Sequence, residues 1–248
     1  MTGRADQRGA PIFGAAGRIG VVVPANNGVL EPELWSRVPE GVAVYATRML
    51  ARGDLTADAV RKMEREVDRA VDELCATGVD VLLIADMVTT FIMEEGWNET
   101  RTSGVAARTG VACVSAWTAL RAALQALGVR RLALGTPYPR GIHALTRPFF
   151  ERAGFVVTGD DTLDILAMAD VPRVTHERIQ GLVASLDRRS ADAVVLLATD
   201  LPTFAVIESL EASTGLAVFT SNQTLLWRAL RVCGNPAAIP GLGQLFTR

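Results

Sequence analysis

Short apolar segments alternate with longer amphipathic segments along almost the whole chain. Seven short segments are rich in Val, Ile and Leu: residues 18–24, 79–86, 111–116, 130–137, 155–160, 191–200 and 216–222. Most are continuously apolar rather than alternating, which is typical of strands covered on both faces. Helix-like segments lie between them. This order predicts an α/β fold with parallel sheets.

The clearest helical segment spans residues 56–78. Apolar side chains recur at three-and-four spacing through it, Thr56 can cap its start, and Gly78 can end it. The pattern predicts one long helix. Further helices are expected within residues 117–128, 140–154, 175–189, 203–215 and 221–234.

Two of the apolar segments resemble each other. "VDVLLIADMVTTF" (79–91) and "ADAVVLLATDLPTF" (191–204) each run into an aspartate, Asp86 or Asp200, and then through Thr to Phe. Two similar halves related by pseudo-symmetry would explain this, with the division near residues 115–120. Ligands bind beyond the carboxyl ends of parallel strands, so facing halves would bring both aspartates to one cleft. Alternatively, each aspartate only caps the helix that follows it.

Composition excludes several classes of function. With a formal net charge of -2 and scattered basic residues, the chain lacks the positive patch of a nucleic-acid-binding or membrane-surface protein. No apolar run is long enough to span a membrane. Residues 1–17 do not form a secretory signal and are expected to be a flexible lead-in. Three cysteines at unrelated spacings give neither a disulfide framework nor a zinc site, so a cytoplasmic location is expected.

Common cofactor and catalytic motifs are missing. The first predicted strand is not followed by G-x-G-x-x-G, and there is no P-loop, H-E-x-x-H or G-x-S-x-G motif. Only two histidines occur, His143 and His176. We therefore expect no cofactor and no metal, and chemistry that uses carboxylates, hydroxyls, amides and backbone donors on a small-molecule substrate.

Longer motifs carry a family resemblance. They are "RIGVVVPANNGVLEPELW" from Arg18, "ALGVRRLALGTPYPRGIHALTRPFFERAGF", "LAMADV", "IESLEASTGLAVFTSNQTLLWRALRVCG" and the tail "PGLGQLF". On these motifs the chain resembles the aspartate/glutamate racemase superfamily, in the branch of arylmalonate decarboxylases and maleate cis-trans isomerases.

The resemblance implies a fold of two pseudo-symmetric Rossmann-like subdomains with parallel four-stranded sheets and a cofactor-free active-site cleft between them. Residues 18–116 with 223–248 would form the first subdomain and residues 117–222 the second. The resemblance also suggests a homodimer.

The catalytic cysteines of that family have no counterpart here. In its racemases and isomerases a cysteine follows the corresponding strand of each half, and the decarboxylases keep only the second. These positions align with Asp86 and Ala198. Cys75, Cys113 and Cys233 lie elsewhere and are expected to pack as small apolar groups. Racemisation by two thiols is therefore excluded.

The family holds a substrate carboxylate with hydroxyls and backbone amides that follow the two strands, and with a tyrosine. Met87 and Val88 replace the hydroxyl pair of the first half, so a two-sided carboxylate site is not expected intact. The residues that the resemblance places at the substrate are Pro24, Asn27, Met87, Val88, Tyr138, Ala198, Thr199 and Asn222.

Asp86 is the favoured catalytic residue. Among Met87, Val88 and Ile92 its carboxyl group would be desolvated, which raises its pKa and makes it a better acid or base near neutral pH. A second carboxylate at Asp200 would raise one of the two pKa values further. A substrate carboxylate against Asp86 would be disfavoured by repulsion. His143, after the Tyr138 turn, is a further candidate for proton transfer.

Three functions remain open on this basis. The first is a lyase or isomerase that acts on a small carboxylate or carbonyl compound, with Asp86 as general acid or base. The second is a hydrolase in which Asp86 activates water for attack on an amide, imide or ester. The third is a protein that binds a small acid without turning it over.

Overall fold

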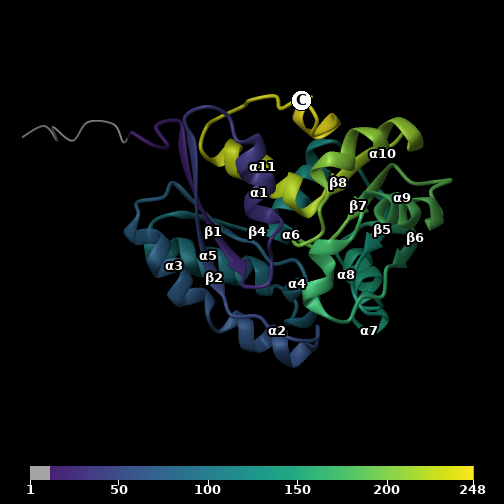
Figure 1. The fold of residues 1–248 in the computed structure, drawn as a ribbon, viewed down its shortest axis with the longest axis horizontal. Coiled ribbons are helices and arrows are strands. Elements are labelled where there is room, and N and C mark those ends of the chain that lie inside the picture. The colour runs from purple at the N-terminus through teal and green to yellow at the C-terminus, as the bar shows by residue number, and fades with distance from the viewer. Residues whose placement is uncertain (1–11, 248) are drawn as a thin grey trace, which may run out of the picture.

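Two parallel four-stranded sheets form the core of the computed structural model, which describes residues 12–247 (Figure 1). The first sheet has the order β2-β1-β3-β4, with strands β1 (Gly17–Pro24), β2 (Val42–Met49), β3 (Val81–Ile84) and β4 (Ala112–Ser115). The second has the order β6-β5-β7-β8, with strands β5 (Arg131–Thr136), β6 (Val156–Thr162), β7 (Ala193–Leu196) and β8 (Ala217–Thr220). The predicted α/β fold with two parallel four-stranded sheets is confirmed.

The two sheets share one topology, because the first and third strand of each half lie in the middle of its sheet. In the first sheet β1 pairs with β3 so that Val22 lies opposite Ile84, and in the second β5 pairs with β7 so that Gly135 lies opposite Leu196. The loops that leave β1, β3, β5 and β7 therefore start at the carboxyl ends of central strands, where parallel sheets bind ligands.

Helices cover the sheets and connect them. In the first half they are α1 (Leu30–Arg37), α2 (Ala57–Glu64), α3 (Val67–Ala76), α4 (Thr89–Ile92) and α5 (Trp97–Thr109). The later ones are α6 (Ala116–Ala126), α7 (Arg140–His143), α8 (Thr146–Arg152), α9 (His176–Ser185), α10 (Ile207–Thr214) and α11 (Ser221–Val232), with 3-10 helices η1 (Met168–Arg173), η2 (Phe204–Val206) and η3 (Gln244–Thr247).

Helices α6 and α11 join the halves. They pack on each other, and each contacts β4 of the first sheet and β8 of the second. One large apolar cluster likewise runs through both halves and includes Val21 and Leu83 of the first sheet and Leu134 and Val195 of the second. The predicted subdomain limits, 18–116 with 223–248 and 117–222, stay a prediction, since these limits fall at helices shared by both sheets.

The helix predicted over residues 56–78 is two helices. Thr56 caps α2 by accepting from the Ala59 N–H (3.2 Å), and Gly78 follows α3 with a φ of +73°, as expected. The chain breaks at Arg65 and Glu66, because α2 packs against α4 while α3 packs against β1 and β2. The single-helix prediction is therefore wrong.

The chain start is only partly described. Of the lead-in predicted over residues 1–17, residues 1–11 lie outside the described residues, and Gly17 is already the first residue of β1. Across residues 12–247, no helix combines the length and the apolar character needed to cross a membrane.

Candidate active site

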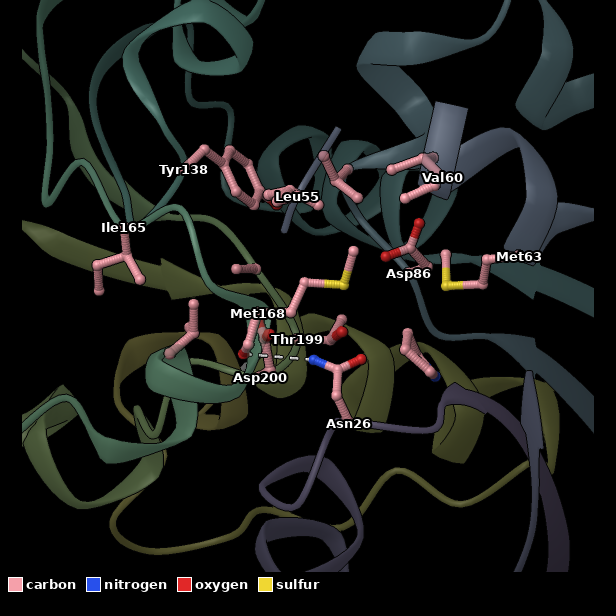
Figure 2. Close-up of a pocket in the computed structure, with 15 residues that line it drawn as sticks. Asn26, Leu55, Val60, Met63, Asp86, Tyr138, Ile165, Met168, Thr199 and Asp200 are labelled. Atoms are coloured by element: carbon pink, nitrogen blue, oxygen red, sulfur yellow. Dashed lines mark hydrogen bonds between the residues drawn. The ribbon is translucent and has the colours of Figure 1, made fainter. Parts of the chain in front are cut away.

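A cavity lies where the loops of the two halves meet. Its inner wall consists of residues that follow the four central strands: Pro24 and Asn26 at β1, Asp86 and Val88 after β3, Tyr138 after β5, and Ala198, Thr199 and Asp200 after β7. The empty space is about 520 Å³ including its opening. Figure 2 shows Asp86 on one side of this space and Tyr138 and Asp200 on the other. Both halves therefore supply polar groups to one site, as predicted.

An apolar wall covers the cavity. It is formed by Leu55, Ala59, Val60 and Met63 at α2 and by Ile165, Met168 and Val171 at η1. The two segments are tied together, since the Leu55 N–H donates to Leu166 O (2.8 Å) and the Met168 N–H donates to Gly53 O (3.1 Å). Such a wall limits water and strengthens electrostatic interactions inside the cavity. The residues of this apolar wall were not predicted to belong to the site.

Asp86 lies two residues beyond β3 and is 7% exposed. The Thr89 backbone N–H donates to its Oδ2 (2.9 Å), and the Thr89 hydroxyl donates to the same oxygen. Asp86 therefore does cap the short helix α4, but neither Thr89 bond uses Oδ1. Burial raises the pKa of the Asp86 carboxyl group, although hydrogen bonds from Thr89 and Val88 oppose the rise.

Asp200 lies four residues beyond β7 and caps no helix. The N–H groups of Thr203 and Phe204, at the start of η2, donate instead to Glu33 Oε1 (2.6 and 2.7 Å). Burial raises the pKa of Asp200 to about 7, and the charge of Asp86 adds to the rise. The capping alternative is thus wrong for Asp200, which lines the cavity beside Ala198 and Thr199.

The two aspartates are not equivalent positions of the two halves. Asp86 follows the end of β3 by two residues, and the residue at that offset from β7 is Ala198. Ala198 has a φ of +91°, which is strained for a residue with a Cβ and is typical of functional sites. The position equivalent to Asp86 is therefore Ala198, in agreement with the alignment of the family's two cysteine positions on these residues.

Tyr138 lines the cavity from the second half. The residue is 3% exposed, its ring packs edge-on against Phe91 (6.2 Å between centroids), and its hydroxyl has no hydrogen-bond partner among the described residues. Burial and the charges of Asp86 and Asp200 raise its pKa well above the ordinary value of 10.0. The hydroxyl therefore stays protonated and can donate to a ligand.

Thr199 connects the halves at the cavity wall. Its hydroxyl donates to Ala85 O (3.0 Å) and accepts from Asn27 Nδ2 (3.2 Å). Asn27 also accepts from the N–H groups of Val29 and Leu30 through Oδ1 and so holds the start of α1. Asn27 does not line the cavity, whereas its neighbour Asn26 does. The asparagine predicted at the substrate is therefore replaced by Asn26.

Three other predicted residues lie outside the cavity lining. Met87 is fully buried in the apolar core. Asn222 donates from Nδ2 to Glu33 Oε2 (2.6 Å). His143 has both ring nitrogens engaged, Nδ1 with Thr136 Oγ1 (3.0 Å) and Nε2 with Asp160 Oδ2 (3.1 Å). Met87 and Asn222 therefore do not line the cavity as predicted substrate contacts, and His143 is not placed to transfer a proton in it.

The lining contains no thiol and no cationic side chain among residues 12–247. Cys75 lies on α3, Cys113 on β4 and Cys233 directly after α11. In the same range, no group of three His, Cys, Asp or Glu side chains could hold a metal ion. The titratable groups that face the cavity are Asp86, Tyr138 and Asp200.

Comparison with known proteins agrees with this architecture. A family model described as arylmalonate decarboxylase matches residues 19–246. The chain is 27% identical to a maleate isomerase of Geobacillus stearothermophilus, over 93% of this chain and 97% of that protein. It is 26% identical to an arylmalonate decarboxylase of Bordetella bronchiseptica, over 92% of this chain and 95% of that protein.

A solved structure is similarly close. It is a maleate cis-trans isomerase of Nocardia farcinica, determined as a cysteine-to-serine mutant with a covalently bound succinylcysteine intermediate. The TM-score is 0.88 at 29% identity, with 93% of this chain and 98% of that chain covered. That protein carries a substrate-derived group on a cysteine, whereas the cavity described above is lined by carboxyl and hydroxyl groups.

Proposed function

Because the chain belongs to the arylmalonate decarboxylase family, we propose that it is a lyase or isomerase in which Asp86 transfers protons to and from a small carboxyl or carbonyl compound. The observation that carries the proposal is the position of Asp86. It is a buried carboxyl group with a raised pKa, it lines the cavity between the halves, and it follows a central strand. A carboxyl group in this state is a suitable general acid or base near neutral pH.

In the isomerase form, Asp86 removes a proton from the carbon beside the carbonyl or carboxyl group. The electron pair of that C–H bond moves onto the substrate oxygen, which accepts a hydrogen bond from the Tyr138 hydroxyl. Asp86 then returns the proton to a conjugated carbon, or Asp200 in its protonated form delivers its own proton to the other face of the same carbon while Asp86 keeps the first. In the lyase form, the bond to a leaving carboxyl group supplies the electron pair, carbon dioxide departs, and protonated Asp86 delivers its proton to the carbon.

Asp200 supports these roles because its pKa of about 7 keeps both its protonated and its ionised form populated near neutral pH. Because Asp86 and Asp200 lie on different sides of one cavity, one can remove a proton from one face of a flat intermediate and the other can add a proton to the opposite face. Tyr138 supports them because its hydroxyl is protonated and has no protein partner among residues 12–247.

Proton NMR in deuterated buffer tests the proposal. The protein and its Asp86→Asn variant are incubated with maleate, an arylmalonate, amino dicarboxylates, and small carboxylated amides and imides. We expect deuterium to enter a carbon beside a carboxyl or carbonyl group, or a carboxyl group to be lost, only with the unaltered protein. Asp58→Asn is a matched control, since Asp58 has the same charge but is exposed on α2.

Cleavage of an amide without carbon exchange would instead identify a hydrolase and contradict the proposal. So would equal exchange by the unaltered protein and Asp86→Asn, because Asp86 would then not carry the proton.

A further inference from the structure

Hydrogen-bond acceptors dominate the polar lining of the cavity. Asp86 and Asp200 contribute carboxyl oxygens, and Asn26 Oδ1 is buried without a partner among the described residues. The Thr199 hydroxyl proton is already donated to Ala85 O. Among the lining side chains within residues 12–247, the Tyr138 hydroxyl has a proton to offer a ligand and no protein partner, whereas Asn26 Nδ2 donates to Met168 O (3.4 Å) and Asp200 offers a proton only in its protonated form.

No positive side chain balances these acceptors. Lys, Arg and His are missing from the lining within residues 12–247. The cation of Arg48, on β2, is outside the cavity lining. It donates to Asn27 O (3.1 Å) and pairs with Glu31. The backbone donor that follows β3, Thr89 N–H, is occupied by the carboxylate of Asp86 itself. A ligand carboxylate on the β3 side would therefore face Asp86 without a free donor, and such buried anions repel.

We propose that the substrate of this cavity carries a protonated nitrogen, of the amine or amidine class, whose N–H groups bind Asp86, Asp200 and Asn26 Oδ1. This inference rests on the proposed function, because the nitrogen is a second group on the compound whose carboxyl or carbonyl end undergoes proton transfer. That end is held at the Tyr138 hydroxyl.

The other walls fit such a compound. The Tyr138 ring offers an aromatic face to a cation, and the sulfur atoms of Met63 and Met168 are polarisable neighbours. Leu55, Val60 and Ile165 supply an apolar surface for a short hydrocarbon body. A cation would also balance the negative charge of the two carboxyl groups, so the acidic pair would gain a partner on binding.

Three unreactive probes with one carbon skeleton test the inference: isobutyramidinium, isobutyramide and isobutyrate. Their charges are positive, neutral and negative, and their sizes match. Dissociation constants are measured by ligand-observed NMR with the unaltered protein. We expect isobutyramidinium to bind about tenfold tighter than isobutyramide or better, and isobutyrate to bind weakest.

Variants locate the binding. Asp200→Asn should weaken isobutyramidinium binding about tenfold or more, while the exposed Asp58→Asn should leave it unchanged. If Asp200→Asn does not fold, the pH dependence of the unaltered protein decides. Cation binding favours the ionised form of Asp200, so the affinity should rise between about pH 6 and pH 8.

Isobutyrate binding as tightly as isobutyramidinium would overturn the inference. Undetectable isobutyramidinium binding, or an affinity that neither Asp200→Asn nor pH alters, would overturn it too. These results are independent of the deuterium experiment: a cavity that prefers the anion could still exchange carbon protons through Asp86. Conversely, a cavity that prefers the cation but exchanges equally in Asp86→Asn would refute the proposed function alone.

Discussion

Asp86 and Asp200 line one cavity from opposite halves of the molecule, where burial raises the pKa of Asp200 and the negative charge of Asp86 adds to the rise. Two acids that interact in this way titrate as a pair, and near neutral pH the pair holds a proton that can be exchanged. No cationic side chain lines the cavity within the described residues to neutralise the pair. The arrangement costs folding stability, which is expected where a site is built for chemistry.

The stability of the protein should fall as pH rises toward neutrality. Asp200 has an ordinary pKa of 3.8 in the unfolded chain and about 7 in the folded protein, so the folded state holds an extra proton between these values. Its contribution is fully present below about pH 4 and is lost as pH rises through about 7. The melting temperature should therefore fall between about pH 5 and pH 8, and less in Asp200→Asn. Equal slopes in thermal unfolding of the two proteins would contradict this.

Tyr138→Phe should lower the activity without lowering the stability of the protein. The hydroxyl group has no partner among residues 12–247, so its removal should leave the free energy of unfolding within about 1 kcal/mol or raise it, because the Phe91 contact remains. The rate of carbon exchange should fall about tenfold or more, since a donor to the developing oxyanion is lost. Urea unfolding and the deuterium assay measure the two effects. A large loss of stability would show that the hydroxyl has an internal structural role.

Glu33 should behave as a neutral acceptor that joins the halves. It accepts from Thr203 and Phe204 N–H and from Asn222, and burial raises its pKa to about 7. Glu33→Gln should therefore be tolerated, because Asn222 Oδ1 is free among the described residues to accept from the new amide after a flip. Glu33→Ala should cost about 2–4 kcal/mol by leaving two backbone donors unpaired. Chemical denaturation compares the variants, and equal losses would contradict the account.

Thr199 should matter through its hydroxyl group rather than its shape. Thr199→Val keeps the volume but leaves Ala85 O and Asn27 Nδ2 without their partner, which should cost about 1–3 kcal/mol. Thr199→Ser keeps the hydroxyl and should lose less than about 1 kcal/mol. Differential scanning calorimetry of both variants checks this. A Val variant as stable as the Ser variant would show that the connection contributes nothing.

The sheets could be predicted because their central strands are continuous apolar runs, in which apolar residues do not recur at the three-and-four spacing of a helix. β2 was missed because residues 42–49 lie at a sheet edge, expose Arg48 and include the polar Thr47, so the segment is not continuously apolar. The break in the 56–78 helix was missed because one apolar face continues through it, while only the tertiary partners of α2 and α3 differ.

The site was predicted where a side chain follows a central strand directly. Asp86 was found in this way, whereas Tyr138 and Thr199 were placed at the site by the family resemblance, and all three line the cavity. Asn26 was missed in favour of Asn27, because neighbouring loop residues point in different directions and the backbone conformation decides which one faces the cavity. The apolar wall at α2 and η1 was missed because its residues look like ordinary core residues in the sequence.

Carbon-13 NMR of protein labelled at the aspartate carboxyl groups tests the central claim most directly. The account predicts that two carboxyl resonances titrate above the ordinary range, that of Asp200 near pH 7, and that Asp86→Asn and Asp200→Asn each remove one. Asp86→Asn should also lower the pKa of the remaining signal, because the charge that raises it is gone. If every aspartate titrates near 4, the cavity holds no acid or base suited to neutral pH, and the account is wrong.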